Sequence, residues 1–74
     1  MKRHVKFIKV IGGWRFMWGH RTFLALRNEA GFAHRDWELW GATVPNPQEG
    51  MKYNEWECIE DQLATRVECV DAAR

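Results

Sequence analysis

The strongest constraint on the fold is a long alternation of side-chain type between Trp14 and Arg27. The even positions are mostly aromatic or apolar, and three of the odd positions are arginines. A period of two is typical of a β-strand that buries one face, whereas a helix repeats every 3.6 residues. The stretch therefore predicts one long strand, with Gly19 marking a bulge or bend within it.

The flanking segments extend this strand into an antiparallel meander. His4–Ile11 is rich in valine, isoleucine and phenylalanine, which predicts a first strand joined to the second by a Gly12–Gly13 turn. Asn28–Gly31 predicts a second turn, and Phe32–Trp40 predicts a third strand. The first half of the chain thus predicts three strands that follow one another in the sheet.

The second half predicts a loop and one helix. Pro45 and the following residues up to Tyr53 predict the loop, and Asn54 has the character of a helix N-cap. A stripe of apolar residues at 3-4-4-3 spacing predicts an amphipathic helix to about Asp71: Trp56, Ile59, Leu63, Val67 and Val70. The predicted fold class is α+β, a single domain of residues 1–74 in which the C-terminal helix packs on one face of a three-stranded meander.

Pairing the predicted strands sorts their side chains onto two faces. The predicted core face collects Val5, Phe7, Ile11, Trp14, Phe16, Trp18, Leu24, Leu26, Trp37 and Leu39. The other face mixes Lys6 and several arginines with large apolar side chains, among them Ile8, Val10 and Met17, and has no helix to cover it. Its candidate partner-binding residues are Arg15, Arg21, Phe23, Arg27 and Trp40, with Arg21 paired to Glu38. Three polar residues that fall on the core face, Lys9, His20 and Arg35, leave room for a bulge that shifts part of this register.

The charges are divided unevenly along the chain, although the net charge is only +1. Residues 1–35 carry eight lysines and arginines but one acid, while residues 36–74 carry nine acids but three lysines and arginines. This division predicts a particle that is positive on one side and negative on the other. A secondary acidic surface is predicted on the helix, formed by Glu57, Glu60, Asp61 and Glu68.

The remaining residue types do not point to an enzyme, a cofactor or a metal site. Cys58 and Cys69 lie three helical turns apart on the predicted helix, too far for a disulfide, and are expected to be free thiols. The histidines stand at positions 4, 20 and 34, without the spacing of a zinc site or a catalytic group. His20 is expected to be a hydrogen-bonded core residue. Free thiols and the lack of a membrane-spanning run predict a cytoplasmic protein.

Two functions remain open from the sequence. The leading hypothesis is a non-enzymatic protein that binds a larger host protein or complex, or a second copy of itself, because Trp, Phe, Met and Arg are enriched in interface cores. The alternative is a nucleic-acid-binding module that stacks bases on Phe23, Phe32 and Trp40 beside its cations. No family motif is matched. In size and style the chain resembles small phage or mobile-element proteins that inhibit a host machine, such as anti-CRISPR proteins, and this resemblance implies an inhibitor that occupies a site on its partner.

Overall fold

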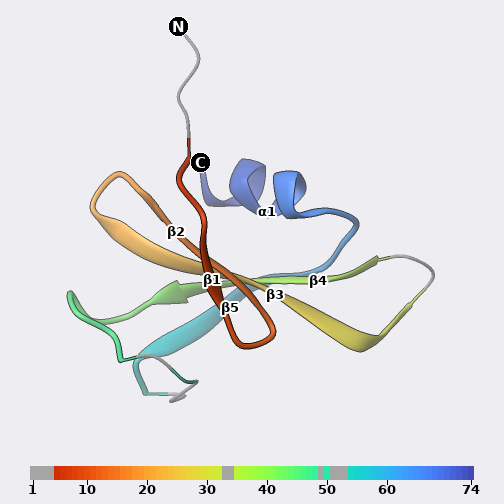
Figure 1. Ribbon diagram of the computed structural model, residues 1–74, viewed down its shortest axis with the longest axis horizontal. Coiled ribbons are helices and arrows are strands. Elements are labelled where there is room, and N and C mark those ends of the chain that lie inside the picture. Colours follow the sequence, from red (N-terminus) through yellow and green to blue (C-terminus); the bar gives the residue numbers. More distant parts are fainter. Residues whose placement is uncertain (1–4, 33–34, 49, 51–53) are drawn as a thin grey trace, which may run out of the picture.

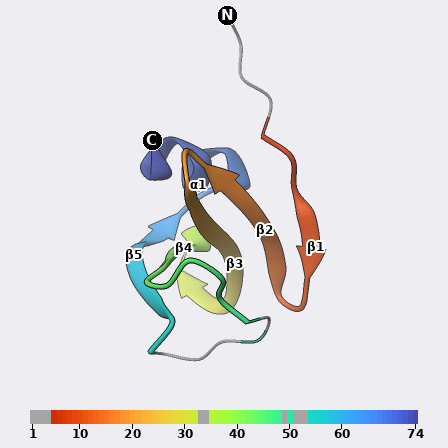
Figure 2. The same cartoon turned by 90° about the vertical axis from the view of Figure 1, so that its left-hand side faces the viewer.

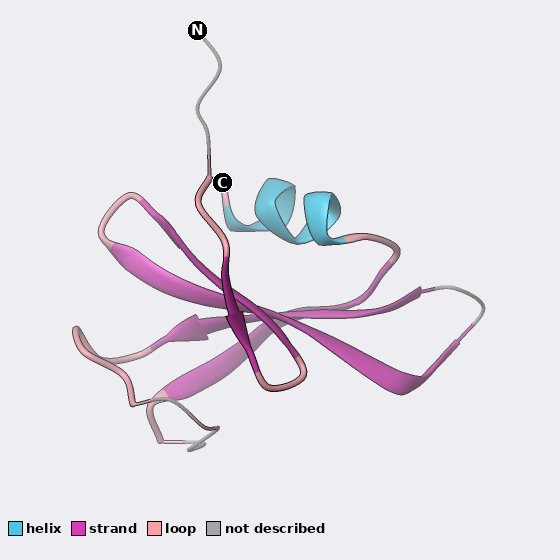
Figure 3. Ribbon diagram, viewed as in Figure 1, coloured by secondary structure: helices cyan, strands magenta, loops and turns pink. Residues whose placement is uncertain are grey.

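The protein is a five-stranded antiparallel sheet with one C-terminal helix (Figures 1 and 3). The computed structural model describes residues 5–32, 35–48, 50 and 54–74. The elements are β1 (Ile8–Val10), β2 (Gly13–Trp18), β3 (Arg21–Phe32), β4 (Arg35–Ala42), β5 (Trp56–Leu63) and α1 (Arg66–Ala73). The strands lie in the sheet in chain order, with β1 and β5 at the two edges. The predicted α+β class and meander are confirmed, but the prediction of three strands is wrong.

The long alternating stretch forms a hairpin instead of one strand. Gly19 and His20 form a turn between β2 and β3, and Trp18 pairs with Arg21 across it. A two-residue turn changes which residues share a face, because an even-numbered residue then pairs with an odd-numbered one. Phe16 therefore pairs with Phe23, and the face chosen for β3 from the alternation is wrong. His20 is exposed in the turn and is not a core residue.

The first turn lies one residue earlier than predicted. Val10 pairs with Gly13, so the turn residues are Ile11 and Gly12, the latter with a φ of 84° that glycine adopts without strain. Ile11, predicted in the core, is fully exposed at the tip of this turn. The predicted second turn at Asn28–Gly31 is also wrong, because β3 continues to Phe32, which pairs with Arg35 of β4.

The greatest departure from the sequence prediction is β5, which occupies the first half of the predicted helix. Trp56 and Leu63 are both buried, but they belong to different clusters on opposite faces of the sheet. Two register shifts against β4 each place one extra residue in β5, and Gln62 takes a φ of 57°. Such bulges disturb the period of two, which explains why the apolar residues have a spacing that resembles a helix.

The helix is confined to α1 and begins at a capping motif. Thr65 is the N-cap, and its hydroxyl accepts a hydrogen bond from the Glu68 backbone N–H at 3.2 Å. The Glu68 carboxylate in turn accepts one from the Ala64 backbone N–H at 3.0 Å. This Thr-x-x-Glu arrangement satisfies two N–H groups at the helix start, and it is a stronger start signal than the one read at Asn54.

Apolar clusters lie on both faces of the sheet. The first, between the sheet and α1, contains the buried Phe16, Phe23, Ala25, Leu39, Leu63 and Cys69, with Val5, Phe7, Trp18 and Trp37 packed against it. The second, on the opposite face, contains Leu24, Ala42 and Trp56, with Val10, Leu26 and Trp40. Leu24 and Leu26 were predicted in the first cluster and lie in the second. The reason is the change of side that the Gly19–His20 turn imposes on β3.

Cations from α1 cover aromatic rings of the first cluster. The Arg66 guanidinium lies 4.4 Å from the Phe7 ring centroid and 4.7 Å from that of Trp14. Arg74, at the other end of the helix, lies 4.9 Å from the Trp18 ring. These contacts hold both ends of a short helix on the sheet, because an arginine over an aromatic face is attracted to it.

Candidate binding groove

The structure distributes the five predicted partner-binding residues over both faces. Phe23 is buried, with only 4% of its surface exposed, and its ring stacks on Phe16 at 5.4 Å between centroids. The expectation that Phe23 is an exposed anchor is therefore wrong. Arg21 lies on the same, helix-covered side, because it pairs with Trp18. Arg15 pairs with Leu24, which pairs with Trp40, so Arg15 and Trp40 lie on the opposite face.

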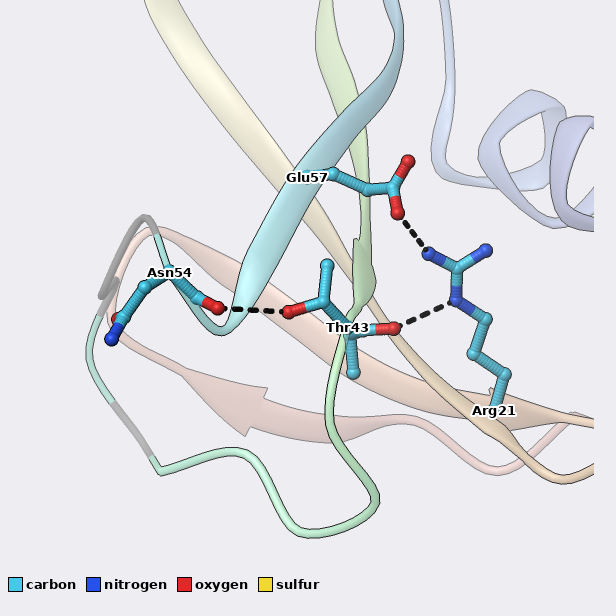
Figure 4. A network of polar contacts seen from close by, with 5 residues as sticks. Arg21, Thr43, Asn54 and Glu57 are labelled. Carbon is cyan, nitrogen blue, oxygen red and sulfur yellow. Dashed lines mark hydrogen bonds and ion pairs between the residues drawn. The ribbon is translucent and has the colours of Figure 1, made fainter.

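Arg21, at the start of β3, contacts both β4 and β5 and so links the β2–β3 hairpin to these strands (Figure 4). Its Nε donates a hydrogen bond to the Ala42 carbonyl at 2.9 Å, and a terminal nitrogen lies 3.0 Å from the Glu57 carboxylate. The predicted partner was Glu38, which instead accepts hydrogen bonds from Asn28 and from the Trp40 indole. Arg21 thus has a structural role that explains its place beside the core.

The two other predicted anchors are also held by neighbouring acids. Trp40 is half-buried, and its indole N–H donates to Glu38 at 3.0 Å. Arg27 is exposed and lies 2.7 Å from the Asp36 carboxylate on β4. A contiguous surface of Arg15, Arg21, Phe23, Arg27 and Trp40 does not form. A role in binding stays a prediction for those of them that solvent can reach.

The predicted acidic surface follows the edge of the sheet instead of a helix. Glu57, Glu60 and Asp61 are exposed on β5, and only Glu68 lies on α1. β1, at the other edge, is flanked by the exposed Lys6 and carries Lys9. Positive and negative side chains therefore gather at opposite edges of one sheet, and acids on an edge strand also discourage its pairing with foreign strands.

Two adjoining hollows lie on the face away from α1, and together we call them the basic groove. One has a volume of about 540 Å³ and the other about 560 Å³, and both are lined by Arg15 and Pro47. The wall on the sheet comes from β1, β2 and β3, and the facing wall comes from the segment between β4 and β5. The described lining residues are Lys6, Ile8, Lys9, Val10, Ile11, Gly12, Arg15, Phe16, Met17, Thr22, Leu24, Leu26, Pro45, Asn46, Pro47, Gln48, Gly50 and Trp56.

The facing wall is positioned by contacts at the two ends of the connecting segment. The Thr43 backbone N–H donates to the Glu55 carbonyl at 2.8 Å, and the Thr43 hydroxyl donates to the Asn54 carbonyl at 3.0 Å (Figure 4). The Gln48 backbone N–H donates to the Glu55 carboxylate at 2.9 Å. Figure 2 shows the segment crossing in front of β3 toward the β1–β2 hairpin. Pro45 and Pro47 favour this non-regular path, and the predicted loop is confirmed over its described part.

The groove combines positive charge with exposed apolar surface. Lys6 and Arg15 contribute two cations, and its described lining residues include no aspartate or glutamate. The Lys9 ammonium lies on the other face of the sheet, 4.7 Å from the centroid of the Trp14 ring. Along the groove, Ile8, Ile11 and Met17 are 43%, 101% and 59% exposed. Ile8 and Met17 line one hollow, and Ile11 lines the other at the tip of the β1–β2 turn. Several large exposed apolar side chains along one groove favour an interaction site, because only solitary ones are ordinary.

Trp56 lines the groove and carries a buried polar group without a partner. It lines the larger hollow and is 3% exposed, yet its indole N–H has no hydrogen-bond partner. A buried N–H without an acceptor costs about 1–3 kcal/mol relative to a satisfied one. In the sequence Trp56 reads as an ordinary residue of a helix stripe, so nothing there indicates this group.

The two cysteines lie on separate elements and do not share a helix face. Cys58 is exposed on β5, and Cys69 is buried under α1 with its thiol 3.9 Å from the Glu38 carbonyl. Burial raises the pKa of Cys69 to about 12, with added repulsion from Glu68 and Glu60. Partial burial, then Glu38 and Asp61, raise the pKa of Cys58. Since the thiolate is the nucleophile, neither environment activates a cysteine for catalysis.

These pKa shifts predict slow thiol chemistry and a loss of stability at high pH. Cys69 should react with iodoacetamide only after unfolding, and Cys58 more slowly than a free thiol, as followed by mass spectrometry in the presence and absence of urea. Above pH 9.0, its ordinary pKa, the Cys69 thiol ionises in the unfolded chain but keeps its proton in the folded one. The free energy of unfolding should therefore fall between pH 9.0 and about 12. The C69A variant should show a flatter profile, while rapid labelling of native Cys69 would contradict the assignment.

The described part of the chain contains neither a candidate metal cluster nor a helix long and apolar enough to cross a membrane. The sequence prediction named Arg15 as a binding residue and placed Lys6, Ile8, Val10 and Met17 on the same uncovered face, and all of them line the groove. It missed Ile11 and Trp56, which were assigned to buried positions. Comparison with known proteins finds no matching family model, no similar curated protein and no similar solved structure.

Proposed function

We propose that this chain is a non-enzymatic binding protein that docks a larger protein partner against its basic groove and acts by occupying a site on that partner. The observation that carries the proposal is the presence of the exposed Ile8, Ile11 and Met17 along a groove that also carries Lys6 and Arg15. Apolar side chains with a positive rim are the composition from which protein interfaces are built. The cytoplasmic location and the phage or mobile-element origin suggested by sequence style remain part of this proposal.

The aromatic arrangement favours protein over nucleic acid as the partner. Binding of single strands without sequence preference relies on exposed aromatic rings on which bases stack. Of the three rings assigned to that role, Phe23 is buried and Trp40 is half-buried and tied to Glu38. The side chain of Phe32 lies outside the described residues. The described aromatics of the groove, Phe16 and Trp56, are buried as well.

The proposal is tested by a matched pair of charge insertions at exposed apolar positions. I11D alters the rim of the groove, while V67D alters an exposed position on α1, 65% exposed and away from the groove. Cross-linking of the tagged protein in host lysate, with nuclease present, captures the partner, and its affinity is then measured for both variants. I11D should weaken binding by at least about 30-fold, because a hot-spot residue contributes about 2 kcal/mol or more. V67D should bind normally.

The same measurement separates the groove from the acidic edge. If the exposed acids of β5 bind a basic groove on the partner, then E57A/D61A would slow association and I11D would bind normally. That result would contradict the proposal. Loss of capture on nuclease treatment would instead support the nucleic-acid alternative.

A further inference from the structure

We propose that the basic groove takes a peptide segment of acidic and apolar residues, with carboxylates near Lys6 and Arg15 and a carbonyl or carboxylate oxygen on the Trp56 indole N–H. This inference rests on the proposed function and specifies the chemistry of the partner. Three observations support it independently: the charge of the groove, its exposed apolar side chains, and the unsatisfied N–H of a buried residue that lines it.

Charge complementarity favours an anionic ligand. Lys6 is exposed at the rim, Arg15 lines both hollows, and no acid lies among the described lining residues. Glu57, Glu60 and Asp61 lie at the opposite edge of the sheet, on β5, whereas Asp36, Glu38 and Glu55 each accept hydrogen bonds from neighbouring donors. Carboxylates of a ligand near Lys6 and Arg15 would gain from their positive charge, which would raise the rate of association more than the final affinity.

The apolar side chains exclude a ligand that is only anionic. Ile8, Ile11 and Met17 are exposed beside the same cations, and burying each of them against a partner removes apolar area from water. A free phosphate or a nucleic-acid backbone has nothing apolar to offer them. A peptide that contains both acidic and apolar residues offers carboxylates to Lys6 and Arg15 and apolar side chains to Ile8, Ile11 and Met17.

Trp56 distinguishes a hydrogen-bonding ligand from a purely hydrophobic one. Its N–H is a strong donor that lacks an acceptor in the free protein, although the residue lines the groove. A peptide carries an acceptor in every residue, as a backbone carbonyl. An acceptor that reaches this N–H on binding would remove the cost of leaving it unsatisfied.

The test is a titration of the full chain with a short, capped peptide of alternating glutamate and leucine, followed by two-dimensional proton–nitrogen NMR. The Trp56 indole signal, assigned by its loss in W56F, should shift strongly, and the backbone signals of Ile8, Lys9 and Ile11 should shift with it. A capped peptide in which lysine replaces glutamate should bind at least about tenfold more weakly, a difference of about 1.4 kcal/mol. Equal binding of the two peptides, or an unmoved Trp56 indole signal at saturation, would overturn the inference.

Charge-matched variants test the rim. K6Q/R15Q should weaken the binding of the glutamate–leucine peptide about tenfold, whereas R27Q/R35Q removes the same charge at exposed residues outside the groove and should have little effect. Equal weakening by both pairs would mean that only net charge matters and would overturn the inference. Binding of oligothymidylate at the same residues in preference to the peptide would overturn it too, as would a dimer of the chain alone that K6Q/R15Q dissociates.

The outcomes also separate this inference from the proposed function. If I11D abolishes capture of the partner while the glutamate–leucine peptide fails to bind, then the groove is the docking site and only the peptide chemistry is wrong. If I11D and V67D capture the partner equally well, then the proposed function fails whatever the peptide does.

Discussion

Replacing Phe23 by alanine should lower the free energy of unfolding by about 3–5 kcal/mol, the usual cost of truncating a buried phenylalanine. Phe23 is 4% exposed and stacks on Phe16, so the substitution leaves a cavity in the main core and removes a ring contact. Domains of this kind are stable by about 5–15 kcal/mol. The F23A protein should therefore be largely unfolded or melt far below the parent, as measured by urea titration followed by circular dichroism.

The matched control is M17A, which truncates a large side chain of the same hairpin that is 59% exposed. This change should alter the free energy of unfolding by no more than about 0.5 kcal/mol, because surface substitutions away from special features have little effect. An F23A protein that keeps its stability would mean that Phe23 lies on the solvent side, as the alternation in the sequence implied. The pairing of Phe16 with Phe23 would then be wrong.

Replacing Gly13 by alanine should cost about 2 kcal/mol or more, in line with overpacking of a site that cannot yield. Gly13 pairs with Leu26, and a Cβ atom built on it would meet the Ala25 carbonyl oxygen and the Leu26 Cα. Both are backbone atoms of β3, so the clash of the added Cβ atom can be relieved only if β2 and β3 move apart. The free energy of unfolding of G13A, measured in urea, checks this expectation.

Gly41 provides the comparison. A Cβ atom there would meet the Ile59 side chain and the end of the Arg21 side chain, 2.6 and 2.7 Å away. The ends of side chains can move, so G41A should cost less than G13A, although it disturbs the contact of Arg21 with Glu57. If G41A proved more destabilising than G13A, the close approach of β2 to β3 would be in doubt.

The site was predicted from the sequence only in its general character. The uneven division of charge along the chain indicated a particle with oppositely charged regions, and the structure has Lys6 and Lys9 at one end of the sheet and Glu57, Glu60 and Asp61 at the other. Which residues share a surface could not be predicted, because a shift of one residue in a turn moves every following side chain to the other face. For this reason the sequence prediction placed Leu24 on the helix-covered face and Phe23 on the opposite face, whereas the structure has the reverse. It also placed Ile11 in the core, although Ile11 is fully exposed.

What the sequence determined by itself was the presence of an antiparallel meander with a C-terminal helix, because both follow from local patterns. These are the alternation of Trp14–Trp18, the glycines of the first turn, the prolines of the connecting loop and the apolar spacing that continues to Val70. Only the tertiary structure decided that Trp56–Leu63 forms a strand and not a helix. Its apolar spacing suits a helix, but its residues pair with β4 and bury Trp56 and Leu63 on opposite faces. The physical reason is that strand pairing and two-sided burial are contacts between distant residues, which outweigh a local periodicity over a segment this short.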